Sequence, residues 1–263
     1  RAMSVIYEPR GRAKEYSPYA LNLYLGCTHG CKYCYAPHAL QRTADNYFVK
    51  PAPRKDVLKY LEKDLSQNQY DKQILLSFIG DVYCETADDG RTTSEALRLL
   101  NAFHAPVAVL SKGGSRMLRD MDVFRTFGDR IAVGATLTFY DECKSREWEP
   151  GAALPTDRLE ILKILHDSGI KTFVSLEPVV EPEESLKLIE QTLLDNSVDH
   201  YKIGKLNNYR GLDKGVDWQE FLIQALKLLR PSKKQVYIKE SLRAAASDVP
   251  LYENEADPQR YIV

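Results

Sequence analysis

Short apolar runs alternate with amphipathic segments along most of the chain. The apolar runs are rich in Val, Ile and Leu and are only a few residues long, as is typical of strands that are covered on both faces of a parallel sheet. Between them, apolar residues recur at helical spacing, as at Val57, Leu61 and Leu65. The predicted strands are 22–25, 74–79, 107–110, 131–137, 171–176, 201–203 and 236–239. The predicted helices are 54–65, 92–103, 116–127, 156–166, 182–194 and 217–229.

This alternation predicts an α/β fold with mainly parallel strands. A closed or partly closed β/α barrel and an open doubly wound sheet both accommodate it. The sequence contains no internal repeat, no low-complexity segment and no evident linker. We therefore expect a single domain over residues 1–263, with a core of about 18–240 and a short polar extension at the C-terminus.

Composition narrows the functional classes. The formal net charge of the 263 residues is −1, so no global electrostatic attraction to nucleic acid or anionic lipid is expected. No stretch is long and apolar enough to span a membrane, and the N-terminus lacks a signal-like segment. Three of the five cysteines lie within eight residues, which is too close for a disulfide framework. This usage predicts metal binding in a reducing compartment, and therefore a cytoplasmic location.

Polar residues follow most of the predicted strands. Because the carboxyl ends of parallel strands meet at one edge of a sheet, these residues are expected to line one binding site. The segments concerned are 27–34, Gly80-Asp81, Ser111-Lys112-Gly113-Gly114, 138–141, Glu177-Pro178 and 204–208.

The three clustered cysteines, Cys27, Cys31 and Cys34, have the spacing C-x3-C-x2-C and follow the first predicted strand. Thiolates select zinc or iron–sulfur centres. Three thiolates can hold an iron–sulfur cube and leave one iron open for chemistry. The alternative is a zinc site completed by His29 or His38. The ligand chemistry favours the iron–sulfur cluster.

With Tyr33 between the second and third cysteines, this motif resembles the signature of the radical S-adenosylmethionine (SAM) superfamily. The resemblance implies a partial (β/α)6 TIM-like barrel and a [4Fe–4S] cluster held by the three cysteines. It also implies that the open iron binds SAM, which one electron cleaves to a 5′-deoxyadenosyl radical that abstracts hydrogen from a substrate. An external electron donor of the flavodoxin or ferredoxin type is expected as a partner.

The stretch 24–37 resembles the branch that contains spore photoproduct lyase and its DNA repair photolyase-like relatives. This resemblance implies that Lys112 approaches the SAM carboxylate, that Thr136 lies near the ribose, and that Glu177 binds the ribose or the substrate. The residues expected to bind the cofactor are Tyr33, Gly80, Asp81, Ser111, Lys112, Thr136, Ser175 and Glu177.

The sequence does not identify the substrate. Cys84, Lys205 and Asn207 are the candidates for residues near the substrate. Cys84 follows the acidic motif, whereas the lyase hydrogen-donor cysteine precedes it, so Cys84 is either a donor or a small buried apolar residue. Basic and aromatic residues at 10–14, 205–210 and 233–243 would suit a nucleic acid but are also common on solvated faces. A radical enzyme acting on a small molecule or peptide, and a non-enzymatic zinc module, are the alternatives.

Overall fold

The computed structural model describes residues 4–207 and 215–263. Its centre is one eight-stranded sheet in which the strands follow one another in sequence order, from β1 to β8. Strands β2 to β8 are parallel, and β1 pairs antiparallel with β2. The strands are β1 Ile6–Tyr7, β2 Tyr19–Leu21, β3 Ile74–Leu76, β4 Val107–Ser111, β5 Ile131–Thr136, β6 Lys171–Val179, β7 His200–Lys205 and β8 Gln235–Ile238.

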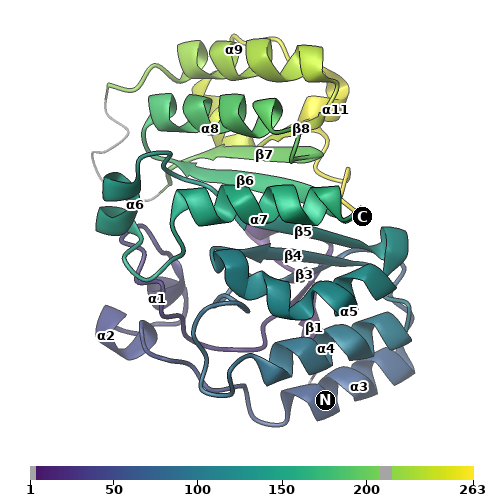
Figure 1. Ribbon diagram of the computed structural model, residues 1–263. Helices are drawn as coiled ribbons and strands as arrows, with labels where there is room; N and C mark the ends of the chain where they lie inside the picture. The colour runs from purple at the N-terminus through teal and green to yellow at the C-terminus, as the bar shows by residue number, and fades with distance from the viewer. Residues whose placement is uncertain (1–3, 208–214) are drawn as a thin grey trace.

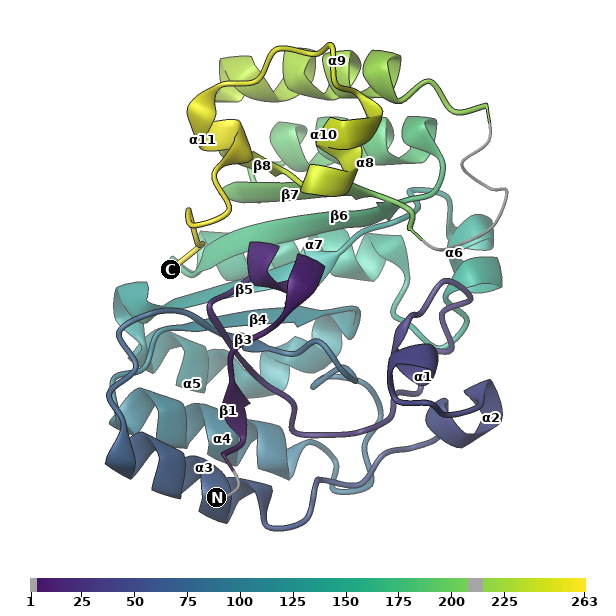
Figure 2. The same cartoon turned by 180° about the vertical axis from the view of Figure 1, so that it is seen from behind.

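A row of helices covers one face of this sheet, which is the outer face of a partial barrel (Figure 1). They are α3 Val57–Gln67, α4 Arg91–Ala102, α5 Met121–Thr126, α7 Pro155–Asp167, α8 Pro182–Leu194 and α9 Trp218–Leu229. The inner face carries the short 3-10 helix η1 and α10 (Figure 2). The remaining helices are η1 Gly11–Glu15, α1 Ala36–Ala39, α2 Ala44–Tyr47, η2 Gly114–Asp120, η3 Gly128–Arg130, α6 Glu142–Trp148, η4 Arg230–Ser232, α10 Glu240–Ala245 and α11 Glu253–Ala256.

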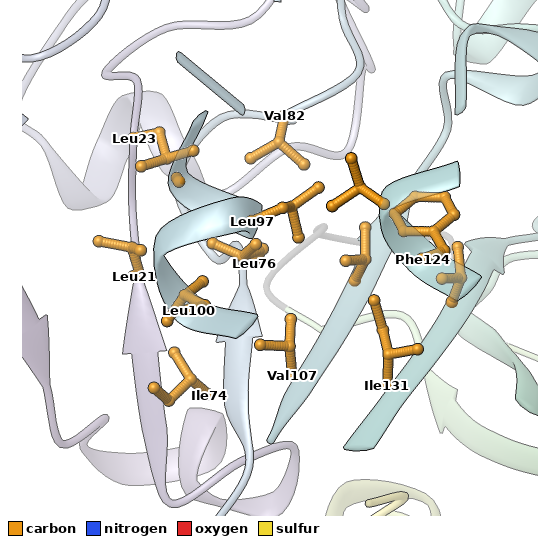
Figure 3. Close-up of a cluster of buried hydrophobic side chains, with 14 of the residues drawn as sticks. Leu21, Leu23, Ile74, Leu76, Val82, Leu97, Leu100, Val107, Phe124 and Ile131 are labelled. Carbon is orange, nitrogen blue, oxygen red and sulfur yellow. The ribbon is translucent and has the colours of Figure 1, made fainter. Parts of the chain in front are cut away.

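The main hydrophobic core lies between the sheet and the outer helices. Figure 3 shows Leu97 and Leu100 of α4 packed over Leu76 and Val107, with Phe124 of α5 beside them. All five side chains are fully buried. Burying each such side chain stabilises the fold by about 1.5–3 kcal/mol, so this layer fixes the outer face of the strands.

The inner face is packed differently, because alternate residues of each strand point to opposite faces. Small residues such as Ala20, Ala108 and Ala132 face inward there, and they pack with Tyr16 and Ile262. The C-terminal residues therefore cover the inner face at the amino ends of the strands, whereas segment 11–16 lies along this face and reaches residues at the end of β6 and after β8. The polar residues that follow the strands lie at the other end.

The predicted α/β partial barrel is confirmed, and the predicted strands and helices are mostly displaced by only one to three residues. The strand predicted at 22–25 is wrong: β2 ends at Leu21, and the Asn22 side chain instead accepts backbone hydrogen bonds from Phe78 and Ile79. The helix predicted at 116–127 is divided into η2 and α5. Within the described ranges, no helix is long and apolar enough to cross a membrane.

Candidate functional site

The cysteine loop, residues 26–35, connects β2 to α1 at the carboxyl edge of the sheet. Cys27 and Cys31 are buried, and Cys34 is partly exposed. Cys27 lies in a small buried cluster with Ala36, Tyr47 and Cys84. Burial raises the pKa of the Cys31 thiol to about 12, although the nearby Lys112 ammonium acts in the opposite direction. The three thiols thus occupy a largely apolar site with a cation beside it.

A second segment, residues 148–153, is hydrogen-bonded to this loop, and we call it the clasp. The Lys32 amide donates to the Trp148 carbonyl at 2.8 Å, and the Gly151 amide donates to the His29 carbonyl at 2.8 Å. A Cβ atom on Gly151 would lie 2.0 Å from the Thr28 carbonyl oxygen, so the close approach of the two backbones requires glycine. The clasp therefore fixes the backbone on both sides of Cys31.

His29 is fully engaged inside the protein. Its Nδ1 lies 3.1 Å from the Gly151 carbonyl oxygen and its Nε2 lies 2.9 Å from Asp81 Oδ2. Each ring nitrogen is thus directed at an oxygen atom of the protein. His29 therefore has no nitrogen left for a metal, and His38 is exposed on α1.

The donor set of the loop thus consists of three thiols. In the part of the chain that the structure describes, no three His, Cys, Asp or Glu side chains converge on a position for a single metal ion. An iron–sulfur cube does not require the three thiolates to converge on one ion, because each thiolate binds its own iron. The residues present fit a three-cysteine [4Fe–4S] cluster better than the Cys3His zinc site that His29 would complete.

Asp81 links the cysteine loop to two strand ends. Its Oδ1 accepts from the Ser111 hydroxyl at 2.7 Å and from the Tyr83 amide at 2.8 Å, and its Oδ2 accepts from the Lys112 amide at 2.7 Å as well as from His29. Burial alone would raise the pKa of Asp81, but His29 and these hydrogen bonds hold the pKa well below its usual range. Both carboxylate oxygens are therefore already used within the protein.

Gly80, which precedes this carboxylate, has φ +77° and lies against the cysteine loop. A Cβ atom there would be 2.7 Å from the Gly26 carbonyl oxygen. Only glycine adopts this conformation readily and also allows the close approach.

A buried ion pair lies beside Tyr33. The side chains of Glu149 and Arg158 are 0% and 1% exposed, and the guanidinium donates to the carboxylate. Glu149 also accepts from the Tyr33 hydroxyl, which lies 3.0 Å from Thr138 Oγ1. Arg158 donates in addition to the Thr136 carbonyl at 2.8 Å. This pair joins the clasp, the cysteine loop and the end of β5.

The charges in this region are arranged around Lys112. Its Nζ lies 5.4 Å from the centre of the Tyr33 ring. Burial would lower the pKa of Lys112, but Cys31 and Glu149 raise it above the usual value. Burial would likewise raise the pKa of Glu149, yet Arg158 and Lys112 lower it to about 2. The wall of the site next to Cys31 is therefore cationic.

A second polar group lies at the ends of β6 and β8. The Tyr16 hydroxyl lies 2.6 Å from Ser175 Oγ and donates to Glu177 Oε2 at 2.6 Å. Lys239 Nζ donates to both Glu177 oxygens at 2.8 Å. Ser175 and Glu177, both expected near the cofactor, are thus held together by Tyr16 and Lys239.

The remaining expected residues are more dispersed. Thr136 is buried at the end of β5. Cys84 is also buried, and it lies in the same apolar cluster as Cys27. Lys205 lies at the end of β7 with its Nζ 5.6 Å from the Trp218 ring, and the Asn207 side-chain amide donates to the Lys205 carbonyl at 2.9 Å. Residues 208–210 of the predicted basic cluster lie outside the described residues.

Sequence reasoning missed Tyr16, Glu149 and Arg158, and considered His29 only as a metal ligand. Tyr16 precedes the first parallel strand, and Arg158 lies inside a helix, so neither follows a strand end. For Glu149, the only local signal is the Pro150-Gly151 pair, which is typical of a turn.

Comparison with known proteins agrees with this geometry. Residues 21–195, more than half of the chain, match the Radical SAM superfamily. An uncharacterized protein of Methanocaldococcus jannaschii is 30% identical over 163 residues, which cover 62% of this chain and 60% of that protein. An uncharacterized protein of Acidianus two-tailed virus is 26% identical over 227 residues, covering 78% and 73% of the two chains.

Two groups of solved structures share the fold. A spore photoproduct lyase with bound SAM and dinucleoside spore photoproduct has a TM-score of 0.60 at 12% identity, over 84% of this chain and 62% of that chain. SuiB of Streptococcus suis bound to SAM has a TM-score of 0.62 at 11% identity, over 89% and 53%. The similarity at these identities is one of fold. Together with the superfamily match and the three-cysteine loop, it establishes that the chain belongs to the radical SAM superfamily of enzymes, which use a [4Fe–4S] cluster and SAM.

Proposed function

We propose that this chain is a radical SAM enzyme that starts its reaction by abstracting a hydrogen atom from a substrate held at the carboxyl edge of the sheet. The observation that carries the proposal is the three-thiol loop, backed by the clasp and by Asp81 and flanked by the Lys112 cation. Cys27, Cys31 and Cys34 would hold the cluster. When bound and reduced, the cluster supplies one electron that splits SAM into methionine and a 5′-deoxyadenosyl radical.

The surrounding residues divide into two roles. The Lys112 ammonium lies over the Tyr33 ring and acts on the Cys31 thiol, and we assign it to the carboxylate of SAM. Asp81 acts through other groups, because its oxygens are occupied by His29, Ser111 and the backbone. We therefore propose Asp81 as a positioning residue that holds the loop and the Lys112 backbone together. Tyr33 is held in the same way by Glu149.

For the substrate we propose a nucleic-acid base. The support is the likeness to spore photoproduct lyase, both in the sequence around the cysteines and in the fold with a bound dinucleoside photoproduct. A peptide is the second candidate, because the fold is equally similar to SuiB, which has been solved with its precursor peptide. One-electron reduction requires a donor protein, and we propose one of the flavodoxin or ferredoxin type.

Isotope transfer tests this proposal. The protein, reconstituted anaerobically with iron and sulfide, is reduced with dithionite in the presence of SAM and DNA prepared from deuterated nucleotides, with ultraviolet-irradiated and untreated DNA run in parallel. Deuterium should appear in the released 5′-deoxyadenosine. The control variant Cys31→Ala should release none. Release of 5′-deoxyadenosine without deuterium from any DNA would reject the nucleic-acid substrate and leave the radical chemistry standing.

A further inference from the structure

Three exposed cations lie in one short segment on the inner face of the sheet. Arg10 precedes η1, and Arg12 and Lys14 belong to its last turn. All three residues are exposed, and among the residues that the structure describes none of the three has an ion pair or a side-chain hydrogen bond. Glu8 is the exposed carboxylate closest to them along the chain. Residues 10–14, which we call the basic segment, therefore carry positive charge that is not neutralised within the protein.

The basic segment is held in place by the two residues that follow it. Glu15 accepts from the Tyr237 hydroxyl and from the Glu240 amide, both at 2.8 Å. Tyr16 is buried, and its hydroxyl donates to Glu177 at 2.6 Å. Figure 2 shows η1 in front of the sheet, on the face opposite to the row of outer helices. The exposed cations are therefore fixed on the inner face, beside the ends of β6 and β8.

The basic residues near β8 are, by contrast, largely engaged within the protein. The stretch 233–243 contains four cations. Lys234 and Lys239 lie near carboxylates, and the Arg243 guanidinium donates to the Ala256 carbonyl. Free positive charge therefore distinguishes the basic segment from this second stretch, although their sequences look alike.

Aromatic side chains connect the basic segment to the cysteine loop. The Tyr16 ring packs edge-on against Phe78, with 6.1 Å between the ring centres. The Tyr35 hydroxyl donates to the Phe78 carbonyl at 2.9 Å. Tyr35 directly follows Cys34 and is 54% exposed, and Phe78 is partly exposed. Cations that follow a phosphate backbone, next to aromatic rings on which bases stack, are typical of single-strand binding surfaces.

The size and charge of the basic segment match a phosphodiester strand. The chain has a net charge of −1, so attraction for a polyanion has to come from local cations. Residues 10–14 extend over about 8 Å at the rise of a 3-10 helix. Three successive phosphates of a DNA strand extend over about 7 Å of helix axis.

We propose that the basic segment binds the phosphate backbone of a single-stranded nucleic acid that crosses the inner face, with its bases toward Phe78 and Tyr35. This inference rests on the proposed function and names the surface that holds the substrate strand. An acidic protein would meet the same cations without using the aromatic rings, so the test includes an acidic polypeptide.

The salt dependence of DNA binding tests the proposal. The reconstituted protein, with SAM present, is titrated against a labelled oligothymidylate of about 15 nucleotides, and fluorescence anisotropy is followed from about 50 to about 200 mM salt. Each phosphate contact adds about 0.7 to the slope of log K against log salt concentration. The variant Arg10→Gln/Arg12→Gln/Lys14→Gln should therefore lose about 2 from the slope and bind at least tenfold more weakly at the lowest salt concentration.

Two further variants separate charge from stacking. Lys55→Gln/Lys59→Gln/Lys63→Gln removes the same charge from exposed positions at and just before α3, and it should leave both slope and affinity unchanged. Tyr35→Ala should weaken binding about tenfold with the slope unchanged, because stacking releases no counterions. Urea unfolding and iron content per chain check that each variant is folded and loaded.

Three outcomes would overturn the inference: no binding of the oligonucleotide by the parent, an equal slope in the parent and the basic-segment variant, or equally tight binding of polyglutamate. The last would indicate an acidic protein as the partner. Deuterium transfer from DNA to 5′-deoxyadenosine reports on the proposed function separately. Transfer with an unaltered slope would reject the basic segment alone, whereas a lowered slope without transfer would reject the substrate and leave the binding surface standing.

Discussion

Replacing Arg158 by methionine should strongly destabilise the protein and loosen the cysteine loop. The substitution keeps most of the aliphatic volume of the side chain but removes its charge. Glu149 would then remain buried without its main cation, since its side chain is 0% exposed. The Ala153 and Thr136 carbonyls would also lose their donors, which now lie at 2.7 and 2.8 Å.

The expected loss is about 3–5 kcal/mol of unfolding free energy, the usual cost of removing one partner from a buried ion pair. The lost hydrogen bonds belong to the same network, so their cost is partly contained in this figure rather than added to it. For a chain of this size the corresponding fall in Tm is on the order of 10 °C. Glu149 also holds the Tyr33 hydroxyl, so the cluster should be lost to an iron chelator faster than in the parent.

Urea unfolding of the protein under anaerobic, reducing conditions measures the first effect, and absorbance at about 400 nm followed after chelator addition measures the second. Lys163→Met serves as the control, because Lys163 and Asp167 form an exposed pair on α7 and should contribute less than about 1 kcal/mol. The double variant Glu149→Gln/Arg158→Met should recover part of the loss, since neither charge is then left alone. A loss below about 1 kcal/mol for Arg158→Met would refute the view that this pair organises the site.

Three further variants test other parts of the site. Asp81→Asn should lower the free energy of unfolding by at least about 3 kcal/mol and accelerate cluster loss, because hydrogen bonds to a buried carboxylate contribute about 1.5–3 kcal/mol each. An unchanged rate of iron extraction by a chelator would contradict the role of Asp81 in linking the loop to the strand ends. Gly151→Ala should lower the free energy of unfolding by about 1–3 kcal/mol and reduce the iron content after reconstitution, since the new Cβ would lie 2.0 Å from the Thr28 carbonyl oxygen. Full iron loading of this variant would contradict the role of the clasp in holding the cysteine loop. Lys202 of β7 is buried next to the Tyr16 ring, where its Nζ donates to the Glu15 carbonyl at 2.8 Å. Burial and Lys239 lower the pKa of Lys202 to about 7, against about 10.4 in the unfolded chain. Between these two pKa values the folded state binds fewer protons than the unfolded chain. The free energy of unfolding of the parent, relative to that of Lys202→Met, should therefore rise between pH 7 and 9 by up to about 1.4 kcal/mol per pH unit. A difference between the two proteins in urea unfolding that does not change with pH would contradict the lowered pKa of Lys202.

The architecture could be predicted from the sequence because its strands are apolar on both faces. The runs at 107–110 and 131–137 carry this signal clearly, and both are strands of the parallel sheet. Residues 22–25 looked similar in hydrophobicity, yet the Asn22 side chain binds two backbone amides of the segment after β3. That contact joins residues 56 and 57 positions apart, and no local pattern encodes it.

The candidate site could be predicted where the family resemblance names a residue, as for Ser175 inside β6, or where a residue follows a strand. Asp81 and Lys112 could be proposed from that position alone, but the saturation of the Asp81 carboxylate by His29, Ser111 and two amides depends on the folded structure. Arg158 could not be found in this way. It lies on the helix after the clasp, and only the tertiary packing brings its guanidinium to Glu149.

The central claim is that the cysteine loop carries a cluster that supports reductive cleavage of SAM. Its most direct test is the amount of 5′-deoxyadenosine released when the anaerobically reconstituted protein is mixed with dithionite and SAM. We expect 5′-deoxyadenosine and methionine in equal amounts from the parent, and none above the protein-free background from Cys31→Ala. A parent protein fully loaded with iron and sulfide that releases no 5′-deoxyadenosine, or a Cys31→Ala variant that releases as much as the parent, would contradict it.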